Sequence, residues 1–165
     1  MLIREITSSD AEAFLELNRQ LDIETSFMLY EPNERTMTVE EQRQMILTVQ
    51  QSQRSVIFVC EIDRQLVGFV TAIGGKQNRN QHKAHIVAGV CQSFSGKGIG
   101  TKLFQTLEAW ARKNGLKRLE LTVMTHNYRA IGLYEKMGFV IEGTKRCSLI
   151  VDGSCVDEYI MAKML

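Results

Sequence analysis

The chain has 165 residues, of which 44% are hydrophobic and 24% charged, a composition typical of a globular protein with one domain over residues 1–165. Its formal net charge of +1 gives no general attraction to nucleic acid or to an anionic membrane, so neither is expected as a partner. The first residues do not read as a signal peptide and no stretch reads as a transmembrane helix, which predicts a cytoplasmic protein.

The N-terminal quarter predicts a strand followed by two helices. Residues 2–6 read as a short strand, and the polar residues after them offer caps for a helix over 11–21. Thr38, with Glu41 three residues later, has the spacing of a capping box. A second helix is therefore expected over 40–51.

Three apolar strands are expected next in the chain. Residues 55–62 and 65–73 are separated only by Asp63 and Arg64, which indicates a hairpin. Residues 84–90 give a further strand.

The following segments alternate between helix and strand. From Gly100 the apolar residues take helical spacing, and Asn114-Gly115 marks the end of this helix. Residues 117–124 read as a strand, and 127–137 read as a helix.

Two strands complete the chain. Residues 139–150 and 155–164 are expected to pair across Asp152-Gly153, the strongest short hairpin signal in the sequence. The whole order predicts an α/β protein, with a mixed sheet (α+β) covered by helices.

The four cysteines show neither a CxxC pair nor a histidine at zinc spacing, so no metal site is expected. A regular two-residue turn would set Cys147 opposite Glu158, which places the sulfur atoms of Cys147 and Cys155 three residues apart and on opposite faces of the hairpin. We therefore expect no disulfide between them, as in a reducing compartment.

Three glycines, Gly96, Gly98 and Gly100, lie between the strand 84–90 and the next helix. A strand, a glycine-rich turn and a helix N-terminus direct free backbone N–H groups at one point, where an anion is favoured. A Walker A loop needs Ser or Thr after Lys97, and the dinucleotide fingerprint needs a glycine where this chain has Thr101. The pattern predicts a phosphate or pyrophosphate site outside these two classes, with a ligand-free turn as the alternative.

A second pair of polar residues stands out on the helix over 127–137. Asn127 and Tyr134 are seven residues apart, so they share one helix face at a separation of about 10 Å. The amide of Asn127 would be free to hold a ligand at the helix start, with a phenol further along. Taken singly, the two residues also fit an N-cap and a core tyrosine.

Together the two stretches resemble the GCN5-related N-acetyltransferase (GNAT) superfamily. Its pyrophosphate motif, Gln/Arg-x-x-Gly-x-Gly/Ala, is matched over 95–100 except at Ser95. Its later motif, Asn-x-x-Ala-x-x-Leu-Tyr-x-x-x-Gly-Phe, is matched in full over 127–139. The resemblance implies a small single-domain enzyme of bacterial type, with a twisted, mostly antiparallel sheet, one splayed pair of strands and helices on both faces.

The resemblance also implies acetyl-CoA as the cofactor, with CoA as the product. The strand before the glycine loop would hold the pantetheine arm, the loop amides would hold the pyrophosphate, and the helix after 127 would contact the arm. The cofactor-binding residues implied in this way are Gly89, Val90, Cys91, Gly96, Lys97, Gly98, Ile99, Gly100, Thr101, Asn127, Ala130 and Tyr134.

N-Acetyl transfer needs a neutral amine and a stabilised thiolate. By resemblance, Tyr134 is expected near the thioester sulfur as the general acid. Strand 84–90 lacks the glutamate that serves as base in several relatives, and His85 is the nearest titratable candidate. A relay of water without a dedicated base is the reading we prefer. Ser95, in place of the family's Gln or Arg, implies modest cofactor affinity.

The acceptor is expected near residues 22–37, which combine apolar side chains with carboxylates. This composition would favour a cationic amine such as a polyamine or a protein N-terminus, and the alternative is a packed loop with solvated charges. The hairpin over 139–164 leaves a strand edge, which favours a homodimer. A non-catalytic acyl-CoA-binding module and a nucleotide-binding protein are the other functions that the residues leave open.

Overall fold

The computed structural model describes residues 1–165 as one seven-stranded sheet with four α-helices and two 3₁₀ turns. The strands are β1 (Leu2–Glu5), β2 (Val56–Ile62), β3 (Gln65–Gly74), β4 (Lys83–Val90), β5 (Arg118–Met124), β6 (Val140–Val151) and β7 (Ser154–Met164). The helices are α1 (Ala11–Glu24), α2 (Val39–Gln50), α3 (Ile99–Lys113) and α4 (Tyr128–Lys136), and the turns are η1 (Ser8–Asp10) and η2 (Gln92–Phe94).

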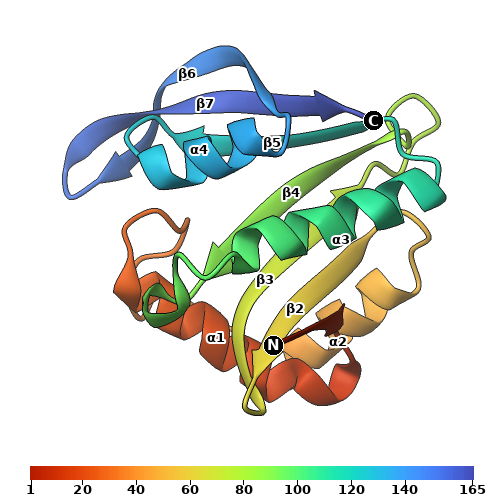
Figure 1. The fold of residues 1–165 in the computed structure, drawn as a ribbon. Helices are drawn as coiled ribbons and strands as arrows, with labels where there is room; N and C mark the ends of the chain where they lie inside the picture. The colour runs from red at the N-terminus through yellow and green to blue at the C-terminus, as the bar shows by residue number, and fades with distance from the viewer.

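The strands lie in the order β1-β2-β3-β4-β5-β7-β6, and every neighbouring pair is antiparallel except β4 and β5. These two parallel strands pair only where Lys83–His85 lie beside Arg118–Glu120. The rest of β4 stays paired with β3 up to Val90. Figure 1 shows β4 and β5 together near the C-terminus and separated at their other ends. The expected mixed, mostly antiparallel sheet with a splayed pair is confirmed.

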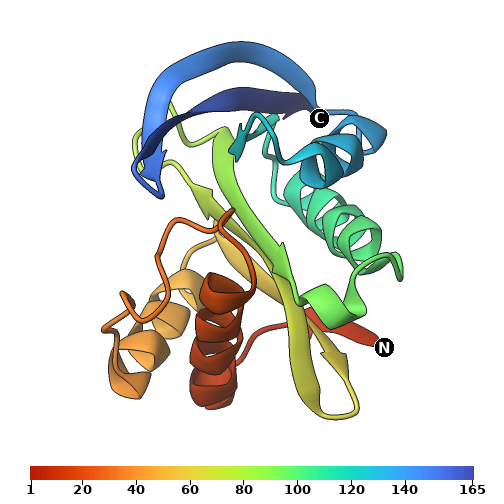
Figure 2. The ribbon, with the colours of Figure 1, turned by 90° about the vertical axis from the view of Figure 1, so that its left-hand side faces the viewer.

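Helices cover both faces of the sheet, and each face has its own apolar core. The even-numbered residues Val56 and Phe58 of β2 belong to the core beneath α3, whereas Ile57 and Val59 belong to the core beneath α1 and α2. Because β2 is buried on both faces, its sequence is continuously apolar rather than alternating. Figure 2 shows α1 and α2 on one side of the sheet and α3 on the other.

Local capping explains where α2 begins, and polar contacts hold the η1 turn that precedes α1. Thr38 accepts from the amide of Glu41, and Glu41 accepts from the amide of Thr38, so the capping box expected before α2 is present. Before α1, Asp10 accepts from the amide of Thr7 at 2.8 Å and forms a bidentate ion pair with Arg4 on β1. These contacts hold the pKa of Asp10 down at about 2, with the hydrogen bond from Arg4 the main cause.

The expectation of no disulfide is wrong, because the structure joins Cys147 to Cys155. The turn itself is the expected two-residue one, and Ile150 pairs with Cys155. Beyond it, however, Glu158 pairs with Lys145 rather than with Cys147, so the β6 strand contains two extra residues. This bulge moves Cys147 along the hairpin toward Cys155, and their Cα atoms lie 4.7 Å apart.

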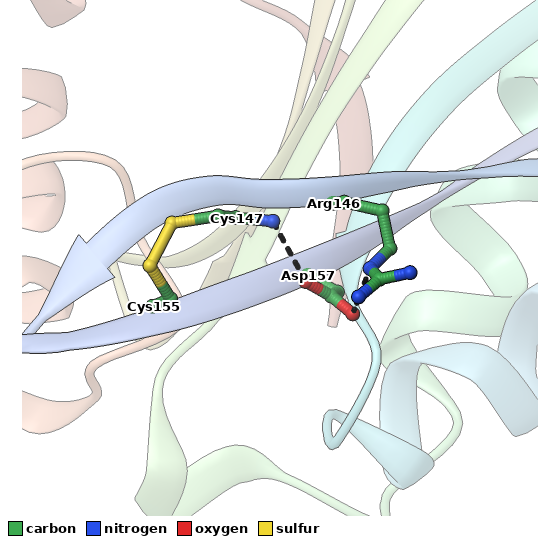
Figure 3. Close-up of a disulfide and its surroundings, with 4 residues drawn as sticks. All are labelled: Arg146, Cys147, Cys155 and Asp157. Carbon is green, nitrogen blue, oxygen red and sulfur yellow. Dashed lines mark hydrogen bonds and ion pairs between the residues drawn. A yellow bond between two sulfur atoms is a disulfide. The ribbon is translucent and has the colours of Figure 1, made fainter.

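Figure 3 shows the bulge and its supports. Cys147 takes a positive φ of 46°, and its amide donates to the carboxylate of Asp157 at 2.7 Å. The same carboxylate lies 4.0 Å from the guanidinium of Arg146. A left-handed, non-glycine residue inside a strand cannot be read from hydrophobic alternation, which is why a regular register was expected.

None of the helices combines the length and apolar character that crossing a membrane requires.

Candidate active site

A cavity of about 1330 Å³ occupies the opening between β4 and β5. Its floor is the stretch of β4 from Ile86 to Val90, which is paired with β3 but has no partner on the β5 side. Its opposite wall is the end of β5 from Thr122 to Met124. The glycine loop, α4, the segment between α1 and α2, and the β6–β7 hairpin complete the lining. The splay therefore leaves one edge of β4 without a strand partner, facing a space long enough for an extended ligand.

The glycine loop presents unpaired amides to this cavity. Gly96 and Gly98 have φ of 79° and 78°, in the left-handed region that favours glycine. The first α3 helical bond runs from the amide of Lys102 to the carbonyl of Gly98, so the amides of residues 99–101 precede the helical ladder. A Cβ built at Gly98 would meet no protein atom within 4 Å, so the space before these amides is open. This arrangement suits a phosphate group.

Gly100 has a different reason to be glycine. A Cβ at this position would lie 2.7 Å from a methyl group of Leu133 on α4, so the Leu133 side chain would have to move. The missing side chain of Gly100 thus leaves room for Leu133 beside the cavity.

The helix α4 places two predicted residues at the cavity. Asn127 caps the helix by accepting from the amide of Ala130 at 3.3 Å, which leaves its side-chain NH₂ free to donate. Tyr134 packs against Phe104 and Phe139, with ring centroids 5.4 and 6.1 Å apart. Burial raises the pKa of Tyr134 to about 12, so its hydroxyl stays protonated over the physiological range.

Eleven of the thirteen predicted site residues line the cavity: His85, Gly89, Val90, Gly96, Gly98, Ile99, Gly100, Thr101, Asn127, Ala130 and Tyr134. Cys91 does not, because it lies fully buried beneath η2 and its amide already donates to the carbonyl of Val67 at 2.9 Å. Burial raises the pKa of the Cys91 thiol to about 11. Lys97 also lies outside, with its ammonium 4.8 Å from the centre of the Phe94 ring.

His85 is the last β4 residue that pairs with β5, and its side chain lines the cavity where the two strands begin to separate. Val87, two positions further along β4, is 45% exposed on the same face. This face carries no helix of its own at that point, so both side chains are available to a ligand.

The segment between α1 and α2 supplies apolar walls but few free charges. Phe27, Met28 and Tyr30 line the cavity. Asp22, expected at the rim, is instead buried and paired with Arg35 at 2.8 and 3.1 Å. Asp22 is thus neutralised within the fold, whereas Glu24 lines the cavity, has no cation partner and accepts from the amide of Gln92 at 2.8 Å.

The polar cavity residues that were absent from the sequence prediction include Arg129, Ser148 and Glu158. Glu158 on β7 is mostly buried and accepts from the hydroxyl of Ser148, which follows the disulfide residue Cys147. No sequence signal gives this pairing, because it depends on the β6 bulge. Arg129 could have been found, because it follows Asn127 within the first turn of the same helix.

An open parallel pair of strands, a glycine loop with free amides and a phenol all line one long cavity, which has room for an extended ligand that carries a phosphate group. The profile of the Acetyltransferase (GNAT) family matches residues 19–139, and the chain belongs to this family. GNAT acetyltransferases use acetyl-CoA as the acyl donor.

Sequence relatives carry acetyltransferase names. The chain is 33% identical over 107 residues to the L-amino acid N-acetyltransferase AaaT of Escherichia coli, a match that covers 62% of this chain and 64% of AaaT. It is 44% identical over 50 residues to the uncharacterized N-acetyltransferase YobR of Bacillus subtilis, covering 30% of this chain and 20% of YobR. The matches thus span less than two thirds of these relatives' own lengths.

Solved structures share the whole fold. An acetyltransferase of the GNAT family from Streptococcus pneumoniae is 27% identical, with a TM-score of 0.97 and 99% of each chain covered. A phosphinothricin acetyltransferase from Sinorhizobium meliloti, solved in complex with acetyl-CoA, has a TM-score of 0.87 at 18% identity, covering 99% of this chain and 88% of its own.

Proposed function

We propose that this protein is an N-acetyltransferase that moves the acetyl group of acetyl-CoA to a primary amine, by direct attack in a ternary complex. The observation that carries the proposal is the continuous cavity, which joins the free amides of the 96–101 loop, the unpaired edge of β4 and the Tyr134 phenol. The open space before Gly98 and the positive φ there fit a phosphate approaching the backbone.

Acetyl-CoA supplies a thioester whose carbonyl carbon an amine attacks, so that an amide forms, the C–S bond breaks and CoA leaves as the thiol. Within the chain, the amides of 99–101 bind the pyrophosphate, and the free edge of β4 at Val90 orients the pantetheine arm and polarises the carbonyl. The backbone groups of Gly89, the neighbouring residue, face β3 instead. Tyr134 donates a hydrogen bond to the departing sulfur as the C–S bond breaks, and the thiolate takes its proton from water. We infer that the amine loses its proton through water, with His85 as the side chain nearest to this path.

The acceptor that we propose is a small amine, a polyamine or a protein N-terminus with an apolar neighbouring group. Support comes from the apolar side chains of Phe27, Met28 and Tyr30 in the cavity wall. Glu158, whose carboxylate is mostly buried and lies 3.7 Å from the ammonium of Lys145, supplies a negative charge that a substrate ammonium group can meet.

A two-stage experiment tests this function. Thermal shift with acetyl-CoA, CoA, ATP and NAD should show stabilisation by the first two ligands alone. Thiol release should then be followed over a panel of polyamines, amino acids and short peptides with free N-termini. Stabilisation by acetyl-CoA without turnover of any amine would favour a non-catalytic acyl-CoA-binding module, and stabilisation by ATP or NAD alone would overturn the proposal.

We further propose a homodimer that works in the cytoplasm, where acetyl-CoA is available, without nucleic acid or membrane as a partner. The disulfide between Cys147 and Cys155 does not support this location, because a reducing compartment keeps thiols reduced. Support for the dimer comes from β6, which is an edge strand of the sheet. Its first two residues, Val140 and Ile141, are exposed apolar side chains, and an exposed strand edge favours pairing with a second copy. Light scattering at high micromolar concentration should give twice the monomer mass, and a monomer under these conditions would exclude the dimer.

A further inference from the structure

The guanidinium of Arg129 lies over the glycine loop. Arg129 is the second residue of α4, it lines the cavity, and its Nη2 atom is 3.4 Å from where a Cβ at Gly96 would lie. Six arginines of the chain are paired with carboxylates, as Arg4 is with Asp10 and Arg35 with Asp22, whereas Arg129 has no ion pair. An unpaired cation is thus positioned directly beside the free amides that begin α3.

The loop itself offers no cation to the same point. Lys97 turns its ammonium toward the Phe94 ring and lies outside the cavity. Ser95, which also lines the cavity, has a side chain too short and neutral to balance a phosphate charge. The remaining cation of α4 at the cavity, Lys136, is seven residues further along and therefore about 10 Å away from Arg129.

We propose that Arg129 binds the pyrophosphate of acetyl-CoA from the α4 side, closing the 96–101 loop around it and supplying the charge that Ser95 does not. The inference rests on the proposed function for the identity of the ligand. A planar guanidinium can donate two parallel hydrogen bonds to phosphate oxygens. It also carries a positive charge that offsets the negative charge of the phosphate, which uncharged backbone amides cannot do.

If Arg129 binds the pyrophosphate, cofactor binding depends on how α4 packs against the glycine loop and the start of α3. Gly100 leaves room for Leu133 of α4 at the start of α3, and Arg129 of the same helix lies beside Gly96. A side chain at Gly96 would enter the space beside the guanidinium, so the glycine there serves the approach of Arg129 as well as the backbone conformation. The guanidinium that would bind the phosphate therefore belongs to the helix α4 and not to the 96–101 loop.

Isothermal titration of CoA into wild type, Arg129→Ala, Arg129→Lys, Ser95→Arg and the double variant Arg129→Ala/Ser95→Arg tests the proposal. A lost charge-assisted hydrogen bond at a partly exposed site should raise the Kd of Arg129→Ala about tenfold, with Arg129→Lys intermediate. Ser95→Arg should restore most of this loss in the double variant and change wild type less. Lys113→Ala is the matched control, since it removes an exposed charge from the last turn of α3 about 20 Å from the loop, and should leave the Kd unchanged.

Two shorter ligands identify the contacted group. With 3′-dephospho-CoA the tenfold effect should persist, and with acetyl-pantetheine, which has no pyrophosphate, it should disappear. A Kd for Arg129→Ala within twofold of wild type, an effect lost with dephospho-CoA, an equal effect on acetyl-pantetheine, or no rescue by Ser95→Arg would each overturn the assignment. Failure of wild type to bind CoA at all would instead overturn the proposed function, and the inference with it.

Discussion

Replacing Tyr134 by Phe removes one hydroxyl from the cavity and leaves the aromatic packing in place. The ring keeps its contacts with Phe104 and Phe139, and the hydroxyl makes no hydrogen bond within the chain that the substitution could break. The melting temperature and the affinity for acetyl-CoA should therefore stay close to those of wild type. A loss of turnover in Tyr134→Phe would then report on the chemistry of the hydroxyl.

The raised pKa of Tyr134 determines how large this loss should be. With a pKa of about 12 for the phenol and about 8.5 for an ordinary thiol, complete proton transfer to the thiolate is uphill by about 5 kcal/mol. The hydroxyl therefore acts mainly by donating a hydrogen bond to the charge that develops on sulfur. Such a bond to a charged group contributes about 1.5–3 kcal/mol. We expect kcat to fall about 100-fold, at the low end of general acid catalysis.

The pH profile gives a second, independent reading. Because the pKa of Tyr134 is raised by burial, the phenol remains protonated up to about pH 11, and kcat should show no descending limb between pH 7 and 10. Activity should instead rise with pH as the acceptor amine loses its proton.

Steady-state thiol release with a confirmed acceptor measures kcat, beside a melting curve for each protein. Tyr128→Phe is the control, because Tyr128 lies on the first turn of the same helix and is 78% exposed. If Tyr134→Phe turns over within threefold of wild type, the hydroxyl does not stabilise the charge that develops on the departing sulfur. A lowered melting temperature with intact turnover would identify a packing residue.

Three further outcomes are expected. Gly98→Val should bind acetyl-CoA at least tenfold more weakly by calorimetry, because a side chain at φ 78° is strained and would fill the space before the amides, and unchanged affinity would show that no phosphate lies there. Asp10→Asn should lower the free energy of unfolding by about 1–2 kcal/mol at pH 7 through loss of the Arg4 pair. Because the pKa of Asp10 is lowered to about 2, this contribution is present above pH 4 and is lost as the pH falls toward 2. If chemical denaturation at pH 2 still showed the variant to be less stable than wild type by the same amount, the ion pair would not be the cause. Replacing Cys147 and Cys155 by Ser should lower the free energy of unfolding by about 2–3 kcal/mol, from the short loop that the disulfide closes, and a reductant that leaves wild-type melting unchanged would argue against the bond.

The features that follow from local sequence were predictable. The capping box at Thr38, the helical spacing after Gly100 and the two-residue turn at Asp152 each depend on a few neighbouring residues, and the structure has all three. The glycine loop and the Asn127 helix were found for the same reason, since each is a continuous stretch with a fixed geometry.

The features that depend on register between distant segments were missed. The bulge at Cys147 shifts the pairing of β6 by two residues, and this shift creates both the disulfide and the contact between Ser148 and Glu158. The pairing of Asp22 with Arg35 likewise requires the chain to fold back between α1 and α2. Hydrophobic alternation carries no information about either event, because the residues involved are polar or lie at a break in the pattern.

The contrast between features set by neighbouring residues and features set by contacts between distant segments also separates the two ends of the cavity. The end facing the 96–101 loop is built largely from backbone amides and glycines, so the same geometry can persist while most side chains around it change. The end beneath Phe27 and Met28 is built from side chains of a connecting segment and of the bulged hairpin, whose arrangement depends on contacts specific to this chain. Membership of the family therefore constrains the acyl donor much more closely than the amine. The identity of the acceptor has to be sought in the α1–α2 segment and in the hairpin that carries Glu158.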